Sequence, residues 1–158
     1  MTNRPNWDEY FLDIAKVVAT RASCLRRQVG AVIVRNKDII STGYNGAPVN
    51  QKSSLDYGFC YRDKNDIESG THLELCRAVG SHAESNAIVL AARNGHATAE
   101  SVMYIYGHQF VCNQCKAMIA NAFIRRVILQ KPDGSIEEYI PEKDWTVHPV
   151  DMKNFKQF

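Results

Sequence analysis

Apolar and polar positions along the chain follow a helical period in some stretches and a strand period in others. Apolar residues recur at helical spacing over residues 7–21, with acidic residues near the start, where they suit the positive end of a helix dipole. Two runs rich in β-branched residues follow at 29–34 and 39–42, joined by turn-prone residues at 36–38. The pattern predicts a helix followed by a β-hairpin.

The remainder of the chain predicts alternating helices and strands after one long polar segment. Residues 47–80 follow neither period, and so long a loop in a compact domain indicates that something anchors it. Later residues predict helices over 83–92 and 113–122 and strands over 102–106 and 127–130. We therefore expect an α/β fold, a central mixed sheet with helices on both faces. Residues 132–158 have a less regular pattern and predict an irregular C-terminal tail.

The composition is that of a folded globular protein. The 158 residues, 45% hydrophobic and 23% charged, fit a single domain over 1–158. A net charge of +2 without a long run of like charges argues against stable nucleic-acid binding but permits a small anionic ligand. No apolar stretch reaches the roughly 18 residues of a membrane span, and the N-terminus has no signal-peptide pattern. We expect a cytoplasmic protein with no membrane partner.

Five cysteines in such a protein need an explanation other than disulfides. Disulfides are rare in the cytoplasm, and an odd number of cysteines cannot all pair. Cys112 and Cys115 form a C-x-x-C where a predicted strand ends and a helix begins, so both thiols can point to one place and the helix N-terminus favours their thiolates. His82 and Glu84 form an H-x-E at the start of another predicted helix.

These two motifs together predict a catalytic zinc site. One histidine and two cysteines make three protein ligands, the number that leaves tetrahedral Zn²⁺ a fourth position for water. We predict that His82, Cys112 and Cys115 bind this zinc and that Glu84 is the general acid/base beside the water. A lone H-x-E is more often a helix cap or a solvent-facing pair. A thioredoxin-like redox pair is the alternative for the cysteines, but it leaves His82 and Glu84 without a role.

The motifs resemble those of the cytidine and deoxycytidylate deaminase family, in which H-x-E is followed by P-C-x-x-C. The segments VGAVIVRNKDIISTGYNGAP and HAESNAIVLAARNG are similar to those of deoxycytidylate deaminases in particular, and the resemblance extends over residues 7–129. It implies a three-layer α/β/α fold and the zinc-dependent hydrolytic deamination of dCMP to dUMP and ammonia, which supplies dUMP for thymidylate synthesis. It also implies a homo-oligomer and regulation by the effectors dCTP and dTTP.

The same resemblance implies two substrate contacts. The resemblance implies that Asn45, in the turn formed by Tyr44, Asn45 and Gly46, hydrogen-bonds to the sugar of the nucleotide. It also implies that Arg26 lies near the 5′-phosphate of the nucleotide. The alternatives are an asparagine that only shapes its turn and a solvated surface arginine.

The remaining cysteines suggest a second, structural zinc. Cys24, Cys60 and Cys76 with His72 make four nitrogen and sulfur ligands, a closed set typical of structural sites. His72 precedes Cys76 by four residues, so the two share a face if this piece is helical. Several members of the family resemble this arrangement, with a second zinc binding the long insertion to the first helix. Ordinary buried or surface thiols are the alternative to this anchor for residues 47–80.

The chain departs from the family pattern at two places. Val111 precedes the first thiol where the family usually has proline, a change that costs about 0.4–1 kcal/mol in conformational entropy and removes no ligand. Gly80 and Ser81 lengthen the approach to His82. Two other interpretations stay open: deamination of cytidine, guanine or tRNA adenosine, and a non-catalytic zinc-stabilised binding module. A tRNA substrate requires a basic surface, and a purely structural zinc has no need of Glu84.

Overall fold

A five-stranded mixed sheet forms the centre of the fold. The computed structural model describes residues 3–148, and its strands are β1 (Gly30–Arg35), β2 (Asp38–Tyr44), β3 (Val102–Tyr106), β4 (Arg126–Gln130) and β5 (Ile136–Tyr139). Their order across the sheet is β2-β1-β3-β4-β5. β3 and β4 are parallel, and every other neighbouring pair is antiparallel. The mixed sheet predicted from the sequence is confirmed.

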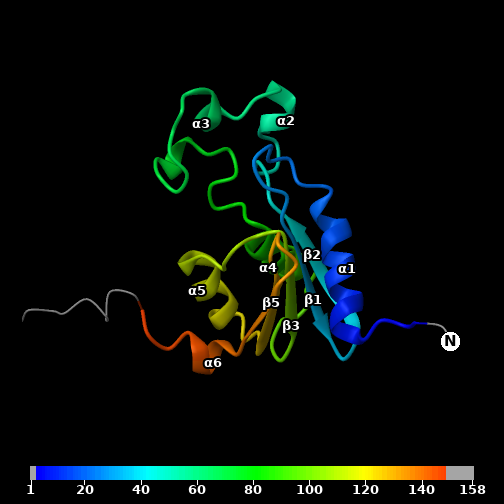
Figure 1. Cartoon of the computed structure of the whole chain (residues 1–158). Helices are drawn as coiled ribbons and strands as arrows, with labels where there is room; N and C mark the ends of the chain where they lie inside the picture. Colours follow the sequence, from blue (N-terminus) through cyan, green and yellow to red (C-terminus); the bar gives the residue numbers. More distant parts are fainter. Residues whose placement is uncertain (1–2, 149–158) are drawn as a thin grey trace, which may run out of the picture.

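Helices cover both faces of this sheet. They are α1 (Trp7–Ala19), α2 (Ser54–Tyr57), α3 (Tyr61–Lys64), α4 (Ala83–Arg93), α5 (Asn113–Asn121) and α6 (Pro141–Asp144), with a 3₁₀ turn, η1 (Leu73–Leu75). α1 packs on one face, and α4 and α5 pack on the other (Figure 1). This is the predicted three-layer α/β/α fold. Within residues 3–148, no helix has the length and apolar character needed to span a membrane.

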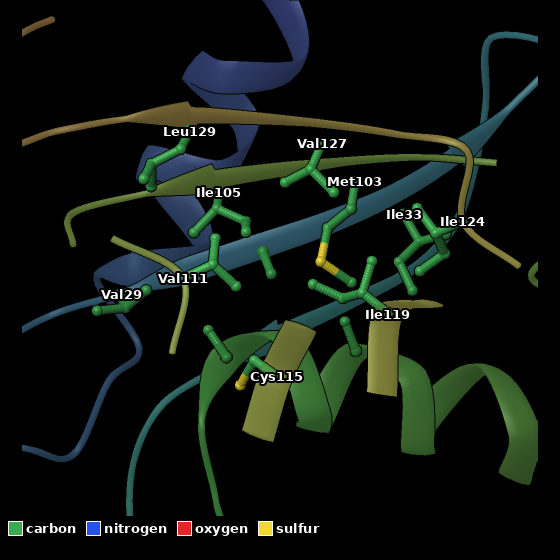
Figure 2. Close-up of a cluster of buried hydrophobic side chains, with 13 residues drawn as sticks. Val29, Ile33, Met103, Ile105, Val111, Cys115, Ile119, Ile124, Val127 and Leu129 are labelled. Atoms are coloured by element: carbon green, nitrogen blue, oxygen red, sulfur yellow. The ribbon is translucent and has the colours of Figure 1, made fainter. Parts of the chain in front are cut away.

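The core is divided in two by the alternation of side chains along the strands. Ile105 and Leu129 lie on the side of α4 and α5 (Figure 2). Their chain neighbours Tyr104 and Ile128 pack under α1 on the opposite face. Because successive side chains of a strand point to opposite faces, the nearly continuous apolar runs of β3 and β4 fill both halves of the core.

The insertion 47–80 contains short helical pieces. It includes α2, α3 and η1, and Figure 1 shows α2 and α3 standing apart from the sheet. Ser53 caps α2 through a reciprocal pair of hydrogen bonds with Asp56, and Gly58 ends this helix in the left-handed conformation. Local capping thus orders α2, whereas α3 and η1 have no side-chain cap.

The prediction of an irregular tail over 132–158 is wrong for residues 136–139. They form β5, which pairs antiparallel with β4 at the edge of the sheet, and α6 follows. Glutamates are unfavourable in strands, but here Glu138 pairs with Arg126 and Glu137 with Lys131. These cross-strand charges offset the weak strand propensity. Residues 149–158 of the predicted tail lie outside the described residues.

A hydrogen-bonded charge network joins α1 to the sheet. Arg126 donates two hydrogen bonds to Asp8, at 3.0 and 2.8 Å, and two to Glu138, at 2.6 and 3.2 Å. The Tyr104 hydroxyl donates to the same Asp8 carboxylate at 2.8 Å. The bonds from Arg126 are the largest cause that holds the pKa of Asp8 below its ordinary value.

Replacing Asp8 with Asn should therefore lower stability in a pH-dependent way. The folded-state pKa of Asp8 is depressed, so its stabilisation is present above the unfolded value near 4 and is lost as the pH falls through the folded value. We expect a loss of about 0.5–1 kcal/mol at pH 7, because the pair is partly exposed, and a smaller loss at pH 3. Denaturant unfolding of both proteins at each pH measures it, and an equal loss at both pH values contradicts it.

Candidate metal centre and active site

The N-termini of two neighbouring helices bring the predicted ligands together. His82 is the N-cap residue of α4, and Cys112 is the N-cap residue of α5, where its sulfur accepts a hydrogen bond from the Cys115 N–H at 3.4 Å. α4 and α5 pack side by side. Because helix N-termini favour negative charge, this position suits two thiolates.

The separations of the three ligand atoms fit a tetrahedral zinc. His82 Nδ1 lies 3.5 Å from Cys112 Sγ and 3.4 Å from Cys115 Sγ, and all three atoms lie within 4.8 Å of one another. Zinc with Zn–S near 2.3 Å and Zn–N near 2.0–2.1 Å places its sulfur and nitrogen ligands about 3.6 Å apart. Within residues 3–148, no other three histidine, cysteine or acidic side chains cluster this closely.

Hydrogen bonds couple the protonation of the three clustered groups. The hydrogen bond with Cys115 is the largest cause that lowers the pKa of Cys112 to about 4, and the same bond raises the pKa of Cys115. The bond with Cys112 raises the pKa of His82. Without a metal the three groups share their protons in this way. A zinc ion replaces those protons and turns both sulfurs into thiolates.

Glu84 is a buried carboxyl group beside these ligands. It is the second residue of α4 and is 5% exposed. Burial is the largest cause that raises its pKa, while the hydrogen bond from Cys115 acts in the opposite direction. An ionised carboxylate in a core is costly, whereas a carboxyl with a raised pKa suits proton transfer near neutral pH. Its place next to three side chains that could hold a metal ion therefore indicates chemistry rather than packing.

Close backbone packing fixes the start of α4. A Cβ at Gly43 of β2 would lie 2.2 Å from the Ala83 carbonyl oxygen, so only glycine permits this approach. The Gly46 N–H donates to the Ser81 carbonyl at 3.2 Å, and the Asn86 side chain donates to the Tyr44 carbonyl at 2.8 Å. The end of β2 thus sets the position of the residues that flank His82.

Comparison with known proteins agrees with this geometry. Residues 5–131 match the family model of the cytidine and deoxycytidylate deaminase zinc-binding region. The chain belongs to the cytidine and deoxycytidylate deaminase family. The resemblance seen in the H-x-E and C-x-x-C motifs is confirmed, and His82, Cys112 and Cys115 form a group that could hold a metal ion in this zinc-binding deaminase domain.

Individual members of this family align with most of the chain. The deoxycytidylate deaminase of Mycobacterium phage D29 is 36% identical over 136 residues, which cover 82% of this chain and 98% of the phage protein. The deoxycytidylate deaminase of Schizosaccharomyces pombe is 30% identical over 155 residues, 89% of this chain but 46% of the yeast protein. The chain thus spans less than half the length of that relative.

A solved structure of the family has the same fold. The dCMP deaminase of cyanophage S-TIM5 in its apo form aligns with a TM-score of 0.59 at 25% identity, over 83% of this chain and 88% of the phage chain. The same enzyme in complex with dCMP and dUMP aligns with a TM-score of 0.62 at 24% identity, over 81% and 83%. The α/β deaminase fold is therefore confirmed.

Asn45 and Arg26, the implied substrate contacts, both have partners in the deaminase domain. Asn45 is buried, and its side chain accepts from the Val29 N–H at 2.8 Å and donates to the Arg27 carbonyl at 2.9 Å. One amide N–H and one oxygen lone pair are left for a ligand. Arg26 forms an ion pair with Asp63 of the insertion at 2.9 Å. Both residues stay predictions as substrate contacts.

The ligands predicted for a second zinc are brought together in part. Cys24, Cys60 and Cys76 line one small cavity of about 20 Å³. His72 does not line it; its ring is exposed and lies 3.2 Å from a Glu74 carboxylate oxygen. The helical spacing expected between His72 and Cys76 does not form, because η1 spans only the residues between them and His72 itself is left-handed.

The charges of Arg27, Cys112 and His82 all act on the pKa of His108, and no sequence motif predicts a role for His108 or Arg27. His108 occupies the loop between β3 and Cys112, with its Nδ1 2.7 Å from the Phe110 carbonyl oxygen. Burial is the largest cause that lowers its pKa. The glycine at 107 was the available signal, since a Cβ there would lie 2.2 Å from the Gln28 carbonyl oxygen and glycine marks close backbone contact.

Proposed function

We propose that this protein deaminates dCMP hydrolytically to dUMP and ammonia. The observation that carries the proposal is a three-ligand nitrogen and sulfur cluster with the buried Glu84 beside it. A structural zinc site is closed by four protein ligands, whereas three ligands leave a position for water. The choice of dCMP is supported by relatives named deoxycytidylate deaminase and by the phage enzyme that binds dCMP and dUMP.

Glu84 has the proton-transfer role in this reaction. Zinc, when bound by the three ligands, supplies a Lewis acid that makes water a stronger nucleophile. Glu84 takes a proton from the attacking water and delivers it to N3 of cytosine as the water oxygen bonds to C4. It then passes the second proton of this water to the amino group, the C4–N4 bond breaks, and ammonia leaves. Its raised pKa lets one carboxyl act first as base and then as acid.

A substrate panel tests this function. The zinc-loaded protein is given dCMP, cytidine, dCTP or a tRNA stem-loop, and ultraviolet absorbance and ammonia release are followed. We expect kcat/KM to be highest for dCMP. Faster turnover of cytidine or of the tRNA assigns a different deaminase substrate, and ammonia release from none of the four supports a non-catalytic binding module.

Other properties implied by the resemblance belong to the proposal as well. We infer a cytoplasmic homo-oligomer whose activity responds to dCTP and dTTP. Light scattering measures the oligomeric state, and dCMP turnover with and without each triphosphate measures the regulation.

A second, structural zinc is also proposed. Cys24, Cys60 and Cys76 are among the residues that line a cavity with room for one atom-sized occupant, and a metal there would join the insertion to the segment that follows α1. His72 would have to leave Glu74 to become the fourth ligand.

Metal analysis should then give two zinc ions per wild-type chain. Cys60→Ser should reduce the number to one, because a hydroxyl is a poorer zinc ligand than a thiolate. Inductively coupled plasma mass spectrometry after exhaustive dialysis measures both proteins. One zinc per wild-type chain would exclude the structural site and leave the catalytic one.

A further inference from the structure

An apolar groove lies between the C-terminal halves of α4 and α5. Its volume is about 380 Å³, which is typical of binding pockets in proteins. His96 and Asn121 belong to its lining and are exposed. The apolar lining comes from both helices and consists of Ile88 and Ala92 of α4, Met118 of α5 and Ala122, which follows α5.

This groove is separate from the group of side chains that could hold zinc. His82 and Cys112 are the N-cap residues of α4 and α5, whereas the groove lies toward the other end of both helices. A segment bound in the groove would therefore contact both helices that carry the clustered ligands and leave the ligands themselves uncovered.

The C-terminal part of the chain leaves the sheet near the end of α5 that borders the groove. β4 begins at Arg126, shortly after α5 ends at Asn121. Tyr139, the last residue of β5, pairs with Val127 at the start of β4. α6 follows and packs against α5 (Figure 1). The described chain ends at residue 148, so the next residues continue from this side of the molecule.

The C-terminal segment, residues 149–158, is long enough to reach the groove. Lys116 of α5 faces the Trp145 ring, which follows α6, whereas Met118 lines the groove. Residues two apart lie on opposite sides of a helix, so the segment has to cross α5. A helix with its side chains is about 10–12 Å wide, and ten extended residues span at most about 33–36 Å.

The sequence of the C-terminal segment complements an apolar groove between two helix C-termini. Met152, Phe155 and Phe158 recur at every third position, and residues three apart share a side of a helical turn. Lys153 and Lys156 stand between them. Cations are favourable near helix C-termini, and α5 has no basic residue in its last turn.

We propose that the C-terminal segment docks in this groove, with Met152 and Phe155 against the apolar lining. Burial of these side chains removes apolar surface of both the segment and the groove from water, which favours docking. The docked segment holds the C-terminal halves of α4 and α5 together, and so it supports the relative position of the two helices that carry His82 and Cys112. This docking does not depend on the proposed dCMP deaminase activity.

A photoreactive benzophenone side chain at position 155 of the whole chain tests the contact. Equal amounts of ¹⁴N- and ¹⁵N-labelled protein are mixed and irradiated, and mass spectrometry identifies the crosslinked peptides and shows whether they come from one chain. We expect crosslinks to residues 88–98 or 118–122 of the same chain. Ala92→Arg, which places a charged side chain in the groove, should remove them.

The same probe at position 10 is the matched control. Tyr10 is exposed on α1, which covers the opposite face of the sheet, so the probe should give no crosslink to the groove. Crosslinks from position 155 to the groove of another chain would assign the groove to a second copy and overturn the proposal. Crosslinks only to other residues, or none, would overturn it as well.

Hydrogen exchange measures the docking without a probe. Phe155→Ser should speed exchange of the amide hydrogens of residues 118–122 about tenfold or more, because the variant loses the apolar burial that stabilises this end of α5. Asn154→Ser changes a neighbouring polar side chain of the segment and should leave these rates unchanged. Equal rates in Phe155→Ser and the wild type would contradict docking in the groove.

Discussion

Glu84→Gln should retain zinc and lose turnover of dCMP by roughly 10²- to 10⁴-fold, the usual contribution of a positioned general acid/base. Glutamine has nearly the same shape, so it fills the buried position without leaving a cavity. Its amide cannot accept a proton from water and deliver it to the base. Because Glu84 is not one of the three clustered ligands, the zinc content should equal that of the wild-type protein.

Zinc content and turnover measured on the same preparation make this result decisive. Glu100→Gln is the matched control, since Glu100 is exposed and pairs only weakly with Arg125 at 3.8 Å. It should keep both zinc and turnover. Loss of zinc together with turnover in Glu84→Gln would mean that Glu84 holds the metal site together. Wild-type turnover would refute its proton-transfer role.

The elements that could be predicted are those whose apolar positions follow a clear helical or strand period and are buried in the structure. β3 was predicted at its observed bounds, and α4, predicted over 83–92, ends one residue later at Arg93, shortly before a left-handed Gly95 that stops the helix. β5 was not predicted because its residues have a low strand propensity. Its glutamates pair with Arg126 in β4 and with Lys131 just after β4, and the local sequence of β5 does not reveal these partners. The helices of the insertion are only three or four residues long, too short to show a period of apolar positions.

The site was predictable because its chemistry is concentrated in two short motifs. His82 and the two cysteines come from different helix N-termini, yet each motif carries its own local geometry, so their meeting could be inferred from ligand number alone. The proposed second zinc had no such support. Its four residues are spread over the chain, and the left-handed backbone at His72 cancels the helical spacing on which the prediction depended.

Val111 stands where the family usually has proline, and the structure shows what the valine side chain contributes. Its side chain is 3% exposed and lies in the core beside Val29 and Ile105 (Figure 2). The sequence predicts that losing proline here costs backbone entropy. The buried valine adds apolar contact in return, and Cys112, which follows it, is still the N-cap residue of α5.

Cys115→Ala should abolish zinc binding and remove the stability that zinc supplies. Cys115 is 1% exposed and belongs both to the core and to the ligand cluster (Figure 2). Alanine keeps an apolar group there but leaves only two ligands, too few for a stable zinc site. Free zinc at 100 to 1,000 times its dissociation constant stabilises the native protein by about 2.7–4.1 kcal/mol, so the variant should lose about that much.

Chelation separates this loss from the effect of a smaller side chain in the core. Unfolding free energies are measured for the wild type and Cys115→Ala, each with zinc and after removal of zinc by a chelator. The difference between the two proteins should be large with zinc and should shrink once zinc is gone, because only the wild type has metal to lose. Ile119→Val, a buried change in the same helix, should cost about 0.5–1.5 kcal/mol under both conditions. If Cys115→Ala behaves like this control, Cys115 serves packing alone and the three-ligand zinc site, with the chemistry assigned to it, is wrong.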